Sequence, residues 1–223
     1  MTAMNLKPKG HEPWWKIRPL APGPVSWTAH MHDRNERSIR DKGDLSLDSW
    51  CQQARSDGGA ADRIDGIRNL ISVWQDACAA GRSPTRQDFL PEALVSILPD
   101  LFMVDVLDRG DMRYRLVGTR LAASFERDPT GQRVDSLLRG SETEKLRDVL
   151  SECVATGKPL AGTTYLLLST GIRSHLQFAT LPLTATPDSD KITMVIGAVA
   201  HTHGVPGLVD LPVTVAFNSI VPD

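Results

Sequence analysis

Cysteines and catalytic motifs are the first places to look for chemistry in this sequence. The three cysteines, Cys51, Cys78 and Cys153, are far apart and form neither a CxxC metal motif nor a disulfide framework. We expect them to be small buried hydrophobic residues or unpaired surface thiols. The sequence contains no GxSxG elbow, P-loop, GxGxxG or HExxH motif. It therefore offers no catalytic motif, and we predict that the protein is not an enzyme.

Two His-x-His pairs have a spacing that metal ligands can use: His30 with His32, and His201 with His203. In an extended chain, side chains two residues apart point the same way, so each pair could share an ion. Zinc requires three or four ligands, and no third ligand lies near either pair at a fixed spacing. Cys51 is the further residue that could be combined with the two pairs into one set of ligands. The pattern favours solvated strand ends. We predict no metal site and keep His201 and His203 as the weakest hypothesis.

The overall composition narrows the classes of partner. The 25 Lys and Arg residues are balanced by 27 Asp and Glu residues, which gives a formal net charge of −2. Nucleic-acid binding usually needs a basic face, so we expect no nucleic-acid partner. No run of 18 apolar residues could span a membrane, and the opening residues lack an apolar signal core. A hydrophobic fraction of 41% suffices for a packed core. We therefore expect a cytoplasmic protein.

Composition also divides the chain into three parts. Residues 1–60 hold most of the tryptophans and carry nine basic and seven acidic residues, and prolines are frequent in the first 27. Proline opposes helices and central strands, so we expect a flexible head, with a short helix near 45–54. Alternatively, its exposed tryptophans form a partner-binding element. The head tryptophans are Trp14, Trp15, Trp27 and Trp50.

Residues 61–203 carry the regular hydrophobic patterns, and residues 204–223 form a short apolar tail. In the tail, Val213, Val215 and Phe217 alternate with Thr214 and Ala216, as in a strand. Such a strand can pair with a sheet edge in this chain or in a neighbour.

The ordered part begins with an amphipathic helix. Its apolar residues Ile64, Ile67, Ile71 and Trp74 are spaced three or four apart and form one stripe, which Gly81 ends. The stripe is too short for us to predict a coiled coil. We expect it to pack on a sheet face or against its own copy in a dimer, and we propose this helix as the transmitting element.

From residue 101 onward, the spacing of the apolar residues changes from that of a helix to that of strands. Residues 101–107 and 112–117 form a predicted hairpin, and a helix follows over 141–157. Three more strands are expected at about 160–169, 173–184 and 191–200. This order predicts an α+β fold: a five-stranded antiparallel sheet with helices on one face, preceded by the amphipathic helix.

Several segments between residues 66 and 200 resemble, in the same order along the chain, the sequences of one protein family. They are Val73-Trp74, residues 81–91, residues 98–106, residues 113–119, Asp128-Pro129-Thr130-Gly131 and Leu181-Pro182-Leu183. In these segments and in its element order, the chain resembles a PAS domain of the stand-alone kind found in alphaproteobacteria. The resemblance implies a sensory or interaction module.

PAS domains that bind flavin covalently use an Asn-Cys-Arg-Phe-Leu type of segment, which is absent here. Haem-binding ones use a His on the long helix, where residues 141–157 have none. The resemblance thus argues against both cofactors, and we predict none.

Two hypotheses follow from this resemblance. In the first, the protein is a non-enzymatic regulatory module that contacts another protein or its own copy, and its apolar residues fill the core. In the alternative, an apolar small molecule occupies the PAS cavity. Arg115, Gln177 and His175 are the polar groups available to such a pocket. The predicted lining residues are Tyr114, Leu116, Phe125, Leu150, Tyr165 and Phe178.

Overall fold

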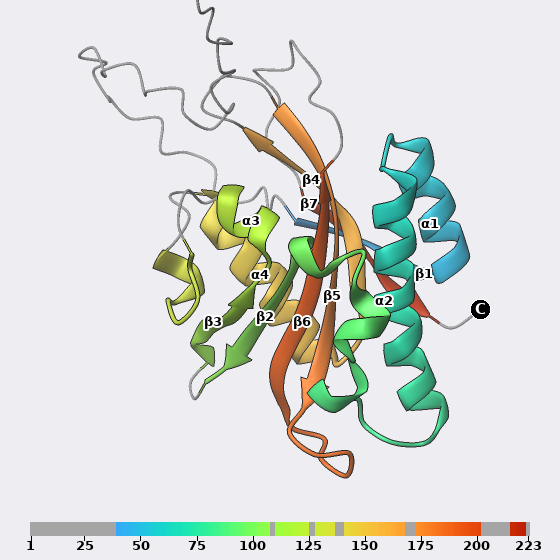
Figure 1. Cartoon of the computed structure of the whole chain (residues 1–223), viewed down its shortest axis with the longest axis vertical. Helices are drawn as coiled ribbons and strands as arrows, with labels where there is room; N and C mark the ends of the chain where they lie inside the picture. Colours follow the sequence, from blue (N-terminus) through green and yellow to red (C-terminus); the bar gives the residue numbers. More distant parts are fainter. Residues whose placement is uncertain are drawn as a thin grey trace, which may run out of the picture.

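A computed structural model describes residues 39–107, 110–124, 128–136, 141–167, 173–201 and 215–221 (Figure 1). These segments form seven strands and four α-helices. None of the described helices is long and apolar enough to cross a bilayer. The elements are β1 Ile39–Ser46, α1 Leu47–Ser56, α2 Ala61–Ala79, β2 Leu101–Val106, β3 Met112–Val117, α3 Thr119–Ser124, α4 Ser141–Thr156, β4 Leu160–Leu167, β5 Arg173–Thr184, β6 Ile192–His201 and β7 Val215–Val221.

The strands form one sheet in the order β1-β7-β4-β5-β6-β2-β3. The five predicted strands are all present as β2 to β6, and their neighbouring pairs are antiparallel. The predicted α+β fold is confirmed, but the sheet has seven strands and not five, because β7 adds to β4 and β1 then pairs with β7 in parallel. The two extra strands come from the segments on either side of the expected domain.

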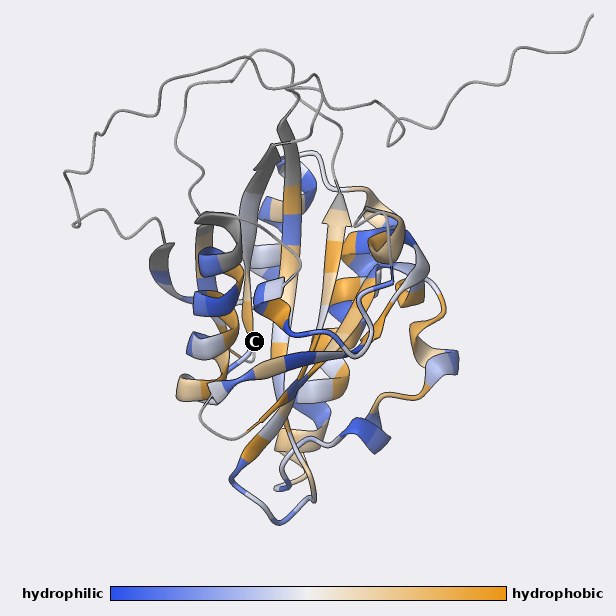
Figure 2. Cartoon of the chain, turned by 90° about the vertical axis from the view of Figure 1, so that its left-hand side faces the viewer, coloured by the Kyte–Doolittle hydropathy of each residue, from blue (hydrophilic) through white to orange (hydrophobic). Residues whose placement is uncertain are grey.

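Helices cover both faces of this sheet: α3 and α4 share one face, as predicted, while the amphipathic helix α2 lies on the opposite face together with α1. Alternation along β2 shows the division: Leu101 and Met103 belong to one cluster of buried residues, and Phe102 and Val104 to another. We call the cluster beneath α1 and α2 the outer core, and the cluster beneath α3 and α4 the inner core. In Figure 2 the hydrophobic parts of the strands lie between helices that are largely hydrophilic on their exposed sides.

The first described residues belong to the folded domain, which corrects the boundary expected at residue 60. Ser46 caps helix α1 by accepting a 3.3 Å hydrogen bond from Ser49 N. One side of α1 then enters the outer core, with Trp50 only 3% exposed and Cys51 fully buried. The sequence pattern of this helix is brief, but its apolar residues, which are Leu47, Trp50, Cys51 and Ala54, are all buried. Trp14, Trp15, Trp27, His30 and His32 lie outside the described residues.

Helix α2 is the predicted amphipathic helix, and its stripe faces the chain's own sheet. Ile64, Ile67 and Ile71 are each 0% exposed in the outer core. Gly81, at φ 72°, follows the end of the helix as expected. Of the two predicted locations for the stripe, packing on a sheet face is confirmed. The dimer contact through these isoleucines is wrong, because they are buried within one chain.

The tail contributes the strand β7, which confirms the strand pattern over residues 215–221. Gly162 of β4 pairs with Phe217, and Ile220 pairs with Leu45 of β1. The tail therefore pairs within its own chain, in the sheet interior rather than at an edge. Residues 202–214, which include His203, lie outside the described residues.

Candidate functional site in the inner core

Three of the six predicted pocket residues meet in the inner core. Tyr114 on β3, Leu150 on α4 and Phe178 on β5 are 3%, 0% and 8% exposed. They share this core because the inward positions of β3 and β5 face the apolar side of α4. Phe125 lies outside the described residues, as does the side chain of Tyr165.

Leu116 does not line this site, which corrects its predicted place there. Strict alternation would align it with Tyr114, but the β2–β3 pairing shifts register between Met103 and Val104. Met103 pairs with Leu116 and Val104 pairs with Tyr114, which leaves Arg115 as the extra residue of a bulge. The shift moves Leu116 to the outer face, where it is 39% exposed. A one-residue slip reverses the facing of every later side chain.

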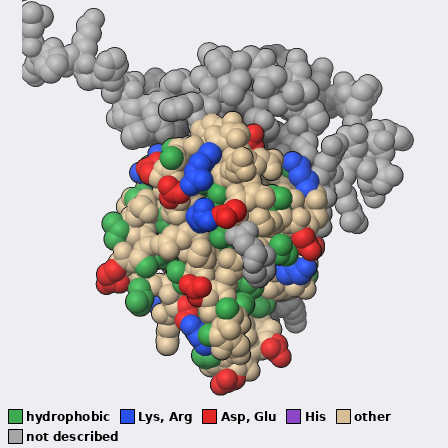
Figure 3. Space-filling model, turned by 90° about the vertical axis from the view of Figure 1, so that its right-hand side faces the viewer, with side chains coloured by type: hydrophobic (Ala, Val, Ile, Leu, Met, Phe, Trp, Pro, Cys, Tyr) green, Lys and Arg blue, Asp and Glu red, His purple; other side chains and the backbone are tan. Residues whose placement is uncertain are grey.

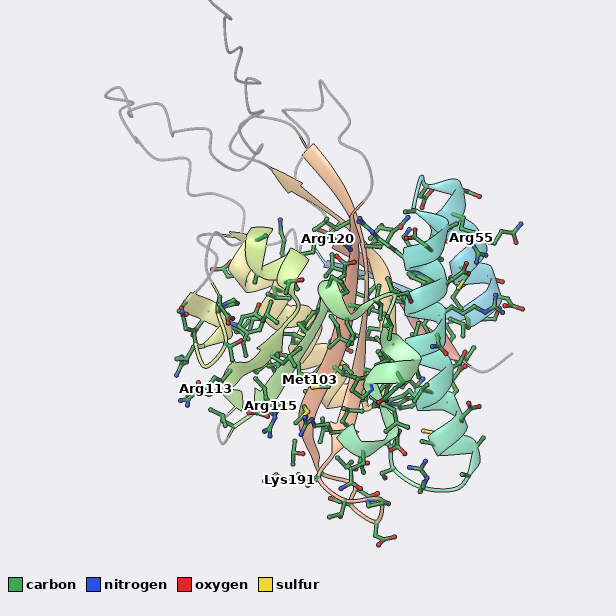
Figure 4. All side chains as sticks on the ribbon, viewed as in Figure 1. Arg55, Met103, Arg113, Arg115, Arg120 and Lys191 are labelled. Carbon is green, nitrogen blue, oxygen red and sulfur yellow. The ribbon has the colours of Figure 1, made fainter. Side chains whose placement is uncertain are left out.

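The polar groups proposed for the pocket are placed elsewhere or not described. Arg115 is exposed and pairs with Asp105 across 3.2 Å, and it projects from the β3 edge with Arg113 (Figure 4). Gln177 is fully buried, but in the outer core, where its Nε2 donates to the carbonyl oxygen of Ala54. Gln177 therefore joins β5 to the end of α1. The side chain of His175 lies outside the description.

The sequence analysis missed one polar group in the inner core, Thr180. It lies two residues after Phe178 on β5, is 1% exposed, and faces the thiol of Cys153 on α4. Within the described residues, the Thr180 Oγ1 makes no hydrogen bond of good geometry, and the Cys153 thiol, a weak hydrogen-bonding group, is the polar group that it faces. The period of two along β5 could have identified it as an inward-facing residue. That its hydroxyl faces the Cys153 thiol could not have been predicted without the structure.

Burial controls the ionisation of the site. Desolvation raises the pKa of the Cys153 thiol to about 12, against a smaller opposing effect of the Thr180 hydroxyl. The pKa of Tyr114 is also raised by burial. Both groups are therefore neutral near pH 7. These two groups therefore add no charge to the inner core, which suits apolar packing or an apolar ligand and opposes thiolate chemistry.

The backbone of Tyr114 fastens the rim of the site. Its N–H donates to Gln132 O at 2.9 Å, and its carbonyl oxygen accepts from Gly131 N at 2.7 Å. The Asp128-Pro129-Thr130-Gly131 turn is thereby joined to the outer edge of β3. This arrangement protects part of an otherwise open strand edge.

A groove of about 570 Å³ lies away from the inner core, at the end of α2 and beside the turn between β5 and β6. Trp74, Arg82, Pro84 and Pro187 are among the residues that line it. The Arg82 guanidinium is already paired with Asp88 at 2.6 Å. This groove therefore differs in place and in lining from the predicted pocket.

No cluster of three His, Cys, Asp or Glu side chains that could hold a metal occurs among the described residues. The backbone of His201 ends β6, but its side chain and the whole of His203 fall outside the description. The His-x-His hypothesis thus remains a sequence prediction.

A sequence model of the PAS domain family matches residues 64–200, which is more than half of the 223-residue chain. The chain belongs to the PAS domain family. The match begins at the first buried residue of the α2 stripe and ends within β6, so it contains the inner core except Phe217 and most of the outer core. PAS membership supports a sensory or signalling role. No curated protein matches the chain.

Several solved structures of LOV proteins are similar to this chain. The LOV protein of Rhodobacter sphaeroides aligns at 16% identity and a TM-score of 0.35, over 46% of this chain and 59% of its own. The RsLOV d2 variant aligns at 13% identity and 0.35, over 66% and 70%. An RNA-binding light-oxygen-voltage receptor aligns at 19% identity and 0.34, over 46% and 28%. The chain spans about three fifths of the first of these proteins. At these identities and TM-scores, the similarity to LOV proteins does not indicate a cofactor or a partner for this chain.

Proposed function

We propose that this PAS domain is a non-enzymatic regulatory module that acts in the cytoplasm by contacting another protein or its own copy. Family membership supports the signalling role. The contact is argued from one observation: Leu116, 39% exposed, lies on the outer face of the edge strand β3. Figure 1 places α1 and α2 over the other half of the sheet. An exposed leucine beside an edge strand is a surface that a second chain can cover.

The face over α1 and α2 is a weaker candidate for this contact. In Figure 3, basic and acidic side chains are interspersed there with separate hydrophobic ones. Broad apolar patches are the usual sign of an obligate interface. The apolar stripe of α2 is already used inside the chain. We therefore place the contact at the β2–β3 end of the sheet.

Light scattering on the full-length protein, together with capture of partners from the host, tests this proposal. We expect Leu116→Glu to weaken the association by at least about tenfold, because charge opposes burial at an interface centre. Leu90→Glu is the matched control, since Leu90 is 59% exposed and lies outside the sheet. If Leu116→Glu leaves both self-association and capture unchanged, the contact does not involve this strand.

A second candidate function is the binding of an apolar small molecule in the inner core. It is favoured by the Thr180 hydroxyl, which is buried without a hydrogen bond of good geometry among the described groups and faces the weakly hydrogen-bonding Cys153 thiol. Such a group costs roughly 1–3 kcal/mol, which a ligand that supplies a hydrogen bond would recover. Tyr114, Leu150 and Phe178 would supply the apolar contacts.

Native mass spectrometry of full-length protein from its host tests ligand binding. A bound mass in the wild type that is reduced in Thr180→Val would support a ligand held through this hydroxyl. The variant keeps nearly the same shape, so a loss of folding would not explain the difference. Absence of a bound mass from both proteins would leave the contact module as the function.

A further inference from the structure

Asp100 is a buried carboxylate at the start of the sheet. It ends the single-turn 3-10 helix Leu98–Asp100, directly before β2, and its side chain is 1% exposed. The Arg120 Nη1 donates a hydrogen bond to its Oδ2, and the Arg63 Nε lies 3.9 Å from the same oxygen. One carboxylate oxygen is therefore shared by two cations.

The two arginines come from opposite faces of the sheet. Arg63 belongs to the first turn of α2, which packs on the outer core, and Arg120 belongs to α3, which packs on the inner core through Leu121. In Figure 4, Arg120 lies between the α3 region and α2. Asp100 is thus a physical link between a helix that closes the inner core and the helix on the other side.

The backbone beside this link has little room to move. Gly118, immediately before α3, donates a 2.7 Å hydrogen bond to Leu101 O. A Cβ atom at Gly118 would lie 2.3 Å from Leu98 O and 2.5 Å from Pro99 C, a spacing that no side chain tolerates. The start of α3 is therefore pressed against the turn that carries Asp100, and a shift of one affects the other.

The electrostatics make this link sensitive to position. Desolvation by burial is the largest influence on Asp100 and raises its pKa, while Arg120 and then Arg63 oppose it and Asp62 of α2 adds to it. Within the described residues, the Asp100 Oδ1 has no hydrogen-bond partner. A buried charge with incomplete compensation depends strongly on each cation that remains. If Arg120 moves away together with α3, the charge of Asp100 is compensated mainly by Arg63. The first turn of α2, which carries Arg63, then changes in stability.

We propose that Asp100 couples helix α3 to helix α2, so that a displacement of α3 on the inner face changes the stability of the first turns of α2 on the outer face. The coupling is a property of this ion triad and holds whichever partner or ligand the domain binds. It provides a route by which the state of the inner core reaches the opposite side of the sheet.

Amide hydrogen exchange of the full-length protein tests the coupling. In Arg120→Gln, we expect residues 61–71 to exchange at least about tenfold faster, the effect of losing one hydrogen bond to a charged group. Residues of β4 and β5 should keep their wild-type rates. Arg120→Lys, which keeps the charge, should restore part of the protection. Arg115→Gln is the matched control, because it removes an exposed Arg–Asp pair that joins no helices.

A double-mutant comparison separates coupling from general weakening. The effect of Arg120→Gln on residues 61–71 should disappear in an Asp100→Asn background, because the shared carboxylate is gone. The proposal is overturned if Arg120→Gln changes exchange only in α3, changes it equally throughout the sheet, or leaves it unchanged. It is also overturned if the effect on α2 persists in full without the Asp100 carboxylate. None of these outcomes depends on whether the contact at Leu116 exists.

Discussion

The indole Nε1 of Trp74 on α2 donates a 2.8 Å hydrogen bond to the carbonyl oxygen of Pro182 on β5. This contact fastens the C-terminal half of α2 to the middle of the sheet. It also shows how the last residue of the predicted stripe is used: its ring packs against the outer core, and its polar group is satisfied by the strand below.

Trp74→Phe should lower the free energy of unfolding by at least about 0.5–1.5 kcal/mol, because the hydrogen bond is lost and the smaller phenyl ring also gives up part of the packing of the indole. Urea denaturation followed by circular dichroism measures this change. The mass in light scattering should not change, since the contact lies within one chain. A variant that is as stable as the wild type but loses a dimer would contradict the assignment.

Removal of residues 1–38 should leave the thermal midpoint nearly unchanged, whereas removal of residues 1–60 should unfold the domain. The longer deletion takes away Leu47 and Trp50, both 3% exposed, and large core residues are worth about 3–5 kcal/mol each. It also removes β1 from the sheet. Calorimetry measures the thermal midpoints of the two truncated proteins. Equal midpoints would mean that the folded domain begins near residue 60.

Iodoacetamide should label Cys78 at least about a hundredfold faster than Cys153 in the native protein at pH 8. Cys78 is exposed, whereas Cys153 is fully buried with a thiol pKa of about 12. Cys51 is also buried, and desolvation raises its pKa. Peptide mapping identifies the labelled residue. Native labelling that persists in Cys78→Ser would mean that one of the buried thiols is accessible.

Asp88 should stabilise the fold at neutral pH and lose this role in acid. Burial acts to raise its pKa, but hydrogen bonds from Thr85 N at 2.8 Å, from Thr85 Oγ1 at 3.0 Å and from Arg82 outweigh it and lower the pKa. A lowered folded-state pKa means that the stabilisation is present above the unfolded value of 3.8 and disappears as the pH falls through the folded value.

Asp88→Asn should therefore cost about 1–2 kcal/mol at pH 7 and progressively less below pH 3.8. Denaturation of both proteins across this range measures the difference. Glu92→Gln, an exposed change on the next turn, should cost under about 0.5 kcal/mol throughout. A constant penalty for Asp88→Asn at every pH would show that the charge of Asp88 is irrelevant.

Local patterns in the sequence predicted most of the elements. The spacing of Ile64, Ile67 and Ile71 defined α2, and alternation along residues 112–117 and 173–184 defined two strands. The pattern at Leu45–Ala54 was too brief to show that one whole side of α1 is buried. The alternation at residues 213–217 predicted the strand β7, but β1 and its parallel pairing with β7 could not be predicted, because they depend on contacts between opposite ends of the chain.

The site was less predictable than the fold. Tyr114 and Phe178 were assigned correctly to one core because each follows its strand's period. Leu116 was misplaced because the bulge at Arg115 leaves no signal in the side-chain types. The triad at Asp100 joins residues far apart in sequence, and no local spacing relates Arg63 to Arg120. Burial and register decide such features, and both are tertiary properties.

The parallel pairing of β1 with β7 has a consequence for the order of folding during synthesis. β1 is the first described strand to leave the ribosome, and its partner β7 is the last. The nascent chain can assemble β2 to β6 and their helices early, while β1 must wait for residues 215–221 to emerge. Until then its backbone hydrogen-bonding groups lack their sheet partner, so the final step of folding joins the two ends of the domain and completes the sheet.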